Sequence, residues 1–91
     1  MKPTTQHELA LYYLIEWDNF SLKDVINDSM FYKFQTRLAE LEAKYGMLAR
    51  RNRRMFISRF GMKRAYNEYQ AIDKKQLINL FNKLQKNDNK R

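Results

Sequence analysis

Stretches of hydrophobic residues at helical spacing occupy both ends of the chain, with one stretch of a different pattern between them. Thr5 and Glu8 form a capping-box signature, in which the hydroxyl and the carboxylate each accept a hydrogen bond from a backbone N–H of the first turn. The apolar positions that follow predict a helix over residues 6–17. They cover nearly its whole circumference, so we expect a central helix that is contacted on several sides.

A second, short helix is predicted behind Ser21, an N-cap candidate that precedes Asp24 by three residues. We expect this helix to end at about Ile26. The polar residues 27–29 are typical of a turn, and Ser29 at its end is a further N-cap candidate for the helix that follows.

The clearest helical period covers residues 30–45, whose apolar positions fall within an arc of roughly 100°. Gly46 suits the left-handed position that closes such a helix. The opposite face carries hydrogen-bond donors at its N-terminal end and small side chains behind them, which favours close approach to the floor of a groove. A plain solvated face is the alternative. The candidate contact residues are Ser29, Tyr32, Lys33, Gln35, Thr36 and Arg37.

After Gly46 the helical period is lost, and aromatic and β-branched residues become frequent. Residues 55–60 and 65–72 are predicted strands, and the tetrad 61–64 is predicted to connect them as a hairpin. Residues 50–54 form either a short strand or a loop. Apolar residues point to both faces of these strands, so the pattern does not identify a buried face.

Asp73 is predicted to cap a last helix with an amphipathic stripe. Two interpretations of the stripe stay open: packing against the domain's own core, and a homodimer interface. A membrane surface would also suit a basic amphipathic helix, but the charge elsewhere disfavours it. Residues 85–91 form a basic polar tail that we expect to be frayed or disordered, which leaves a single domain over residues 5–84. The stripe consists of Leu77, Leu80, Phe81 and Leu84.

Charge is unevenly placed along the chain, and its distribution bears on function. Residues 1–30 hold two Lys against five acidic residues, whereas residues 31–64 hold ten Lys or Arg against two Glu. Such polarisation is typical of a nucleic-acid-binding face, and arginine in particular suits bidentate contact with phosphate. A solvated basic loop is the alternative. The densest cations are Arg50, Arg51, Arg53, Arg54, Arg59, Lys63 and Arg64.

The remaining composition argues against an enzyme. The chain of 91 residues is long enough for one domain, and it has no cysteine and only one histidine, His7. We therefore expect no catalytic residue, no metal and no cofactor. The longest apolar run, residues 9–15, is far shorter than the roughly 20 residues that span a bilayer, and the start lacks the apolar core of a secretory signal. These features predict a cytoplasmic protein with no membrane partner.

The order of elements resembles a winged helix-turn-helix domain, an α+β fold with three helices, a basic β-hairpin wing and here a C-terminal helix. Residues 36–46, with an Arg-Leu-x-x-Leu-Glu run closed by Gly46, resemble the end of the recognition helix in winged-helix regulators. Residues 57–64, followed by residues 66–69, resemble the wing of small phage and prophage helix-turn-helix proteins. The resemblance covers about residues 5–72 and leaves the last helix outside.

The resemblance implies double-stranded DNA binding by a phage or mobile-element transcription regulator or architectural factor, in the host-cell cytoplasm if phage-encoded. The helix over residues 30–45 would lie in a major groove, and residues 60–64 would reach the backbone or minor groove. A protein-binding adaptor is one alternative, with Tyr12, Tyr13 and Trp17 partly exposed to engage a host protein. RNA binding is another, because exposed aromatic residues stack on bases.

Overall fold

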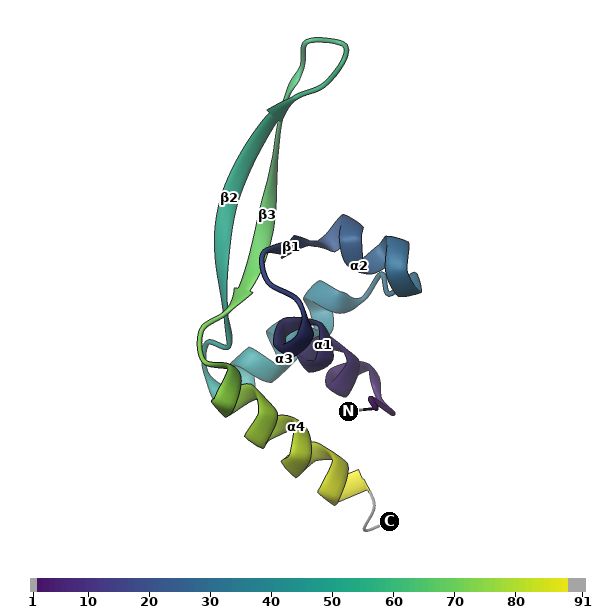
Figure 1. Cartoon of the computed structure of the whole chain (residues 1–91), viewed down its shortest axis with the longest axis vertical. Coiled ribbons are helices and arrows are strands. Elements are labelled where there is room, and N and C mark those ends of the chain that lie inside the picture. Colours follow the sequence, from purple (N-terminus) through teal and green to yellow (C-terminus); the bar gives the residue numbers. More distant parts are fainter. Residues whose placement is uncertain (1, 89–91) are drawn as a thin grey trace.

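The computed structural model describes residues 2–88 and shows an α+β chain (Figure 1). The three strands of the described residues form one antiparallel sheet in the order β1-β3-β2. This arrangement is compatible with the layout of a winged-helix domain. The elements are α1 (Gln6–Glu16), β1 (Phe20–Ser21), α2 (Leu22–Ser29), α3 (Phe34–Tyr45), β2 (Ala49–Ile57), β3 (Lys63–Ala71) and α4 (Lys74–Asp88).

Three of the helix starts lie where the sequence predicts them. The hydroxyl of Thr5 accepts from the backbone N–H of Glu8 at 3.2 Å and begins α1. Ser21 and Asp24 form a complete capping box at the start of α2. The carboxylate of Asp73 accepts from the backbone of the first turn of α4, 3.0 Å from the amide of Lys75. Local hydrogen bonding therefore sets these three starts.

Helix α1 is the central helix that its apolar circumference predicts. It contacts α3, α4 and β3, and its residues Ala10, Leu11, Tyr13 and Leu14 are almost completely buried. In Figure 1 α1 crosses the middle of the helical part, with α4 below it. None of the helices within residues 2–88 is both long and apolar enough to cross a bilayer.

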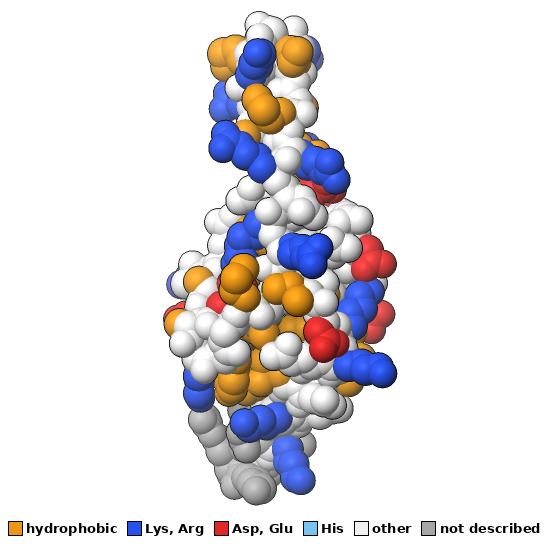
Figure 2. All heavy atoms as spheres, turned by 90° about the vertical axis from the view of Figure 1, so that its left-hand side faces the viewer, with side chains coloured by type: hydrophobic (Ala, Val, Ile, Leu, Met, Phe, Trp, Pro, Cys, Tyr) orange, Lys and Arg blue, Asp and Glu red, His pale blue; other side chains and the backbone are white. Residues whose placement is uncertain are grey.

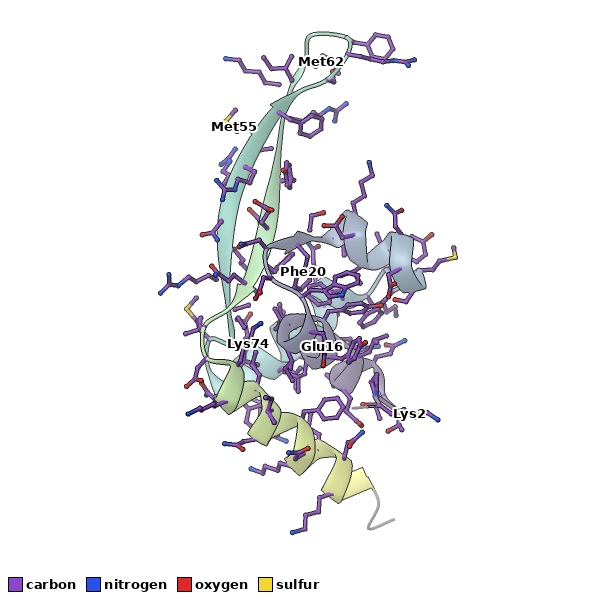
Figure 3. All side chains as sticks on the ribbon, viewed as in Figure 1. Lys2, Glu16, Phe20, Met55, Met62 and Lys74 are labelled. Atoms are coloured by element: carbon purple, nitrogen blue, oxygen red, sulfur yellow. The ribbon has the colours of Figure 1, made fainter. Side chains whose placement is uncertain are left out.

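An aromatic cluster joins the sheet to the helices. The ring of Phe20 lies between the hairpin and the helices (Figure 3), with its centroid 5.6 Å from the ring of Phe34 and 5.9 Å from that of Tyr69. Phe34 and Tyr69 meet edge to face at 5.1 Å. These three rings come from β1, α3 and β3, so the first turn of α3 is packed directly on the sheet.

The boundary between α2 and α3 differs from the sequence-based prediction. Helix α2 continues to Ser29, and α3 begins at Phe34 instead of residue 30. Met30 adopts the left-handed conformation with φ 56° and closes α2, and its side chain is exposed instead of lying in the core. The buried Tyr13 hydroxyl lies 2.6 Å from both Asp28 Oδ2 and Ser29 Oγ. This contact from α1 holds the last turn of α2 in helical form, so Ser29 is not the N-cap of α3.

The apolar stripe of helix α4 packs against the core of the same protomer. Leu77, Leu80 and Phe81 are buried in the same core as α1, and Leu84 packs against that core with partial exposure. The packing interpretation therefore holds for Leu77, Leu80 and Phe81, whose assignment to a homodimer interface is corrected. The helix also continues to Asp88, so residues 85–88 are not a frayed tail. Residues 89–91 of the predicted tail lie outside the described residues.

The hairpin of β2 and β3 projects far beyond the helices (Figure 1). Its strands pair from Ala49 opposite Ala71 to Ile57 opposite Lys63, so the segment 50–54 is a strand. The connection spans residues 58–62, not 61–64, and Arg64 belongs to β3. Nine residues span about 30 Å in a strand, which accounts for much of the 53 Å long axis of the molecule.

Candidate nucleic-acid interface

Arg51 holds the hairpin against α3. Its Nη2 lies 2.5 Å from Glu42 Oε1, and its guanidinium lies 5.6 Å from the centre of the Tyr69 ring. Glu42 Oε2 also accepts from the backbone N–H of Leu48 at 3.0 Å, at the entry to β2. The sequence places Arg51 among the DNA-contacting cations, whereas the structure gives it an acidic partner and a ring contact inside the protein.

Hydrogen bonding keeps Glu42 ionised. Partial burial opposes its charge, but the hydrogen bonds from Arg51 and from the Leu48 amide outweigh that effect, and the pKa of the Glu42 carboxyl lies below its ordinary value of 4.5. The same pairing raises the pKa of the Arg51 guanidinium. Glu42 is thus the point at which α3, the connection after it and β2 are joined.

We expect the folded state to lose part of its stability when Glu42 is protonated. Because the folded pKa is lowered, this contribution is complete above the ordinary value of 4.5 and is lost as pH falls through the folded pKa. Glu42→Gln should lower the free energy of unfolding at pH 7 by on the order of 1 kcal/mol and reduce its pH dependence in acid. Urea unfolding at pH 7 and at pH 3 measures both effects, with the exposed Glu16→Gln as control. Equal acid sensitivity of Glu42→Gln and the wild type would contradict this role.

Arg54 is also paired, although more openly. Its Nε lies 2.6 Å from Glu68 Oε1 on β3, while its side chain stays 56% exposed. The register sets Arg54 opposite Tyr66 and Glu68 opposite Asn52, so the ion pair runs diagonally across the two strands. Arg54 can still face a ligand, but part of its charge is already compensated.

Five other predicted cations of the hairpin have no acidic partner among residues 2–88. All five are exposed. Figure 2 shows Lys and Arg side chains spread over the hairpin, with hydrophobic side chains between them towards its far end. Uncompensated charge of one sign on a projecting element attracts polyanions. These residues are Arg50, Arg53, Arg59, Lys63 and Arg64.

Helix α3 exposes the polar and small face that its sequence predicts. Gln35 and Thr36 lie in its first turn and are exposed, and Ala39 and Ala43 follow on the exposed side of the helix. Gln35 Nε2 also donates to the Tyr69 hydroxyl at 2.9 Å, which fixes its position relative to β3. The small residues allow a groove floor to come close to the helix backbone.

The other residues predicted to contact DNA from this helix lie in different parts of the structure. Tyr32 and Lys33 are exposed in the turn before α3 instead of inside the helix. Arg37 donates to Gln6 Oε1 at 2.7 Å and to Glu40 Oε1 at 2.9 Å, so it is occupied on the side of α1. Arg37 is therefore separated from the exposed face of α3. Ser29 is also separated from it, because it ends α2.

The N-terminus of α3 is open, unlike those of its neighbours. Thr5 and Ser21 cap α1 and α2 through their side chains, whereas Lys33 at the N-cap of α3 makes no side-chain cap hydrogen bond. The first-turn N–H groups and the positive end of the helix dipole favour an anion at such a position. The ammonium group of Lys33 adds a full positive charge beside it.

A groove of about 590 Å³ is bordered by the hairpin, the start of α2 and Gln35 of α3. Lys23 of α2 and Gln35 of α3 line one side, and Phe56, Tyr66 and Asn67 of the hairpin line the other. The N-terminal ends of both helices and the middle of the hairpin thus border one concave surface. Sequence reasoning missed Lys23 and Asn67, since only the fold brings them to the groove. Phe56 and Tyr66 lie within the predicted strands, residues 55–60 and 65–72.

The acidic residues of α3, Glu40 and Glu42, do not line the groove, whose acidic residues are Asp24 and Glu68. Glu42 is paired with Arg51, and Glu40 Oε1 accepts from Arg37 and lies 2.9 Å from His7 Nε2. The hydrogen bonds from Arg37 and His7 hold the pKa of the Glu40 carboxyl below its ordinary value. Both carboxylates are therefore ionised but compensated from within the protein.

The aromatic surface expected on the N-terminal half is smaller than predicted. Tyr13 is 1% exposed, and Tyr12 and Trp17 are partly buried against the core.

Within residues 2–88, no group of three or more His, Cys, Asp or Glu side chains is placed to hold a metal ion. No family model matches the chain, and neither a curated protein nor a solved structure matches it.

Proposed function

We propose that the protein binds double-stranded DNA as a winged helix-turn-helix domain, with α3 as the recognition helix and the β2–β3 hairpin as the wing. One observation carries the proposal: five hairpin cations are exposed and have no acidic partner among residues 2–88, and the open first turn of α3 borders a groove together with the same hairpin. Neither feature contributes to the core, so both are available to a ligand. Phosphate contacts from such groups supply most of the affinity of non-specific DNA binding.

In the proposed complex α3 enters the major groove, which is about 12 Å wide and admits a helix. Thr36 and Gln35 would face base edges, while Lys33 and the first-turn amides would contact a phosphate. Tyr32 lies next to them and is exposed. Ala39 and Ala43 would let the later turns follow the groove wall without a steric clash.

The hairpin would contact the backbone beside that groove. The aromatic cluster and the Arg51–Glu42 ion pair already fix its base relative to α3. The protein therefore does not have to order the hairpin on binding, which favours affinity. Because the stripe of α4 lies in the protomer's core, the proposal requires no dimer, and a monomer would bind one unsymmetrical site. Regulation of transcription in a phage or mobile element, or an architectural role, remains the proposed context.

RNA binding is the second candidate, because the hairpin exposes the rings of Phe56, Phe60 and Tyr66 and stacking on bases is the usual use of such rings. Gel-mobility shifts at matched salt with one sequence as duplex DNA, single-stranded DNA and structured RNA separate the two functions. Tighter binding of duplex DNA supports the proposal. Preference for RNA or for the single strand would contradict it.

The salt dependence of duplex binding tests the number of phosphate contacts. If the five unpaired cations each neutralise a phosphate, log affinity should fall with log salt at a slope of about −4.5. Arg53→Ala with Arg64→Ala should reduce this slope by about 1.8 units and weaken all duplexes alike. Lys75→Ala with Lys86→Ala removes the same charge from α4 and should leave the slope nearly unchanged. Equal effects of the two pairs would mean that net charge, not the hairpin, drives binding.

A further inference from the structure

The tip of the hairpin exposes apolar side chains that the proposed phosphate contacts do not use. Phe60 is 78% exposed and Met62 is 51% exposed, and both lie in the connection between the strands. Figure 3 places Met62 at the extreme end of the molecule, remote from the helices. Apolar side chains that are exposed at a projecting tip are unfavourable in water, which points to a ligand that covers them.

Hydrogen bonds hold this tip in one conformation. The backbone N–H of Ser58 donates to Met62 O at 2.8 Å, and that of Gly61 donates to Ser58 O at 2.8 Å. The Ser58 hydroxyl accepts from the Met62 amide at 3.2 Å. Gly61 turns the chain with φ 79°, a conformation that suits glycine. Phe60 therefore lies in a hydrogen-bonded turn.

Three cations lie within four residues of the exposed ring in the sequence. The Arg59 guanidinium lies 5.0 Å from the centre of the Phe60 ring, and Lys63 and Arg64 begin the strand that leaves the turn. None of the three has an acidic partner among residues 2–88. An apolar side chain framed by phosphate-binding cations is the arrangement by which proteins open base steps from the minor groove.

We propose that Phe60, supported by Met62, inserts between base pairs in the minor groove and bends the DNA. This inference rests on the proposed duplex binding and adds a deformation of the DNA to it. The insertion would bury the ring against the separated bases, and Arg59, Lys63 and Arg64 would hold the phosphates on either side. Burial and charge neutralisation together would offset the loss of stacking at that step.

The length of the hairpin fits this placement. From Asn52 to Ile57 the strand advances about 17 Å at 3.4 Å per residue, beyond the part of β2 that packs on the helices. One turn of DNA is about 34–36 Å long, so neighbouring major and minor grooves are about 17 Å apart along the axis. With α3 in the major groove, a hairpin of this length would be long enough for its tip to reach the adjacent minor groove.

The other ligands for an apolar tip fit less well. Inserting the hairpin into lipid would bury cations with the apolar residues, because Arg64 lies opposite Phe56 and Lys63 lies opposite Ile57 along the strands. Pairing with the tip of a second copy would bring equal positive charges together. A DNA groove accepts both the ring and the cations.

Phe60→Ala tests the wedge directly. Energy transfer between dyes at the two ends of a short duplex measures bending, and a 2-aminopurine base measures unstacking. The wild type should bend the duplex by roughly 20–90° and raise the 2-aminopurine fluorescence. Phe60→Ala should lose both signals and bind about tenfold more weakly, with an unchanged salt slope because no phosphate contact is lost. Ile78→Ala on α4, an exposed apolar residue remote from the hairpin, is the matched control and should behave as wild type.

The outcomes separate this inference from the proposed function. Binding by the wild type without bending or unstacking, or equal bending by Phe60→Ala, overturns the wedge and leaves duplex binding intact. Absence of any duplex shift by the wild type overturns both. Anionic phospholipid vesicles are the last arm: if Phe60→Ala loses vesicle binding but keeps wild-type bending, the tip serves a lipid surface and the wedge is overturned. Circular dichroism of Phe60→Ala checks that the exposed substitution leaves the fold unchanged.

Discussion

Replacement of residues 54–66 by the two-residue turn Asn-Gly is expected to leave the helical part folded and to abolish most DNA affinity. The replaced residues are exposed apart from Ser58, whereas Ala49 and Tyr69, which anchor the hairpin in the core, are kept. Asn-Gly suits the tight turn of a two-residue hairpin. The shortened protein loses the unpaired cations Arg59, Lys63 and Arg64, so its salt slope should flatten by about 2.7 units and its affinity for any duplex should fall more than tenfold.

Two measurements decide the outcome of this truncation. Thermal unfolding followed by circular dichroism should show a cooperative transition close to that of the wild type, because the deleted residues bury little apolar surface. A variant that keeps the hairpin but carries Arg59→Gln, Lys63→Gln and Arg64→Gln is the control, and it should reproduce most of the loss in salt slope. Wild-type affinity in the truncated protein would remove the hairpin from the proposed interface. A truncated protein that fails to fold would show instead that the hairpin stabilises the domain.

Local signals in the sequence were sufficient for much of the fold. The caps at Thr5, Ser21 and Asp73 depend on side chains within three residues of the backbone groups they bond, so a short window contains the whole interaction. The amphipathic period of α4 and the strand character after Gly46 are local in the same sense. These elements were therefore predictable without tertiary structure.

The start of α3 was not predictable in this way. Residues 27–29 are typical turn residues, but the Tyr13 hydroxyl holds Asp28 and Ser29 in the last turn of α2 from a different helix. These two contacts join residues that are 15 and 16 positions apart in sequence, so a window of helical spacing does not contain both partners. The prediction started the recognition helix four residues too early, with Ser29 as its N-cap and with Tyr32 and Lys33 inside it.

The candidate site shows the same limit for charge. The sequence identifies a basic segment but cannot tell which cations are already paired. Arg51 and Arg54 find Glu42 and Glu68 only because α3 and β3 fold alongside β2. The fate of the α4 stripe was open for the same reason, since an amphipathic face requires burial but its period does not specify the partner surface.

Base recognition by α3 is expected to depend most on Thr36. Its hydroxyl lies in the exposed first turn, in the region where recognition helices approach base edges. Once a preferred site has been found by selection from random duplexes, Thr36→Ala should weaken that site by about 1–3 kcal/mol and change binding to random duplex much less. Thr36→Ser retains the hydroxyl and should keep most of the preference. Lys33→Ala should weaken both kinds of duplex together, because a phosphate contact carries no sequence information.

The side chain of Gln35 has a structural role as well as a predicted contact with DNA. It donates to the hydroxyl of Tyr69, which is only 3% exposed, so Gln35→Ala would remove a base contact and disturb the joint between α3 and the hairpin at once. Gln35→Ala combined with Tyr69→Phe removes both partners of that hydrogen bond and isolates the contribution to DNA. If this pair and Thr36→Ala reduce preferred and random duplex in equal proportion, α3 reads no bases. The affinity would then come from the hairpin and the phosphates alone, as expected for a non-specific architectural protein and not for a site-selecting regulator.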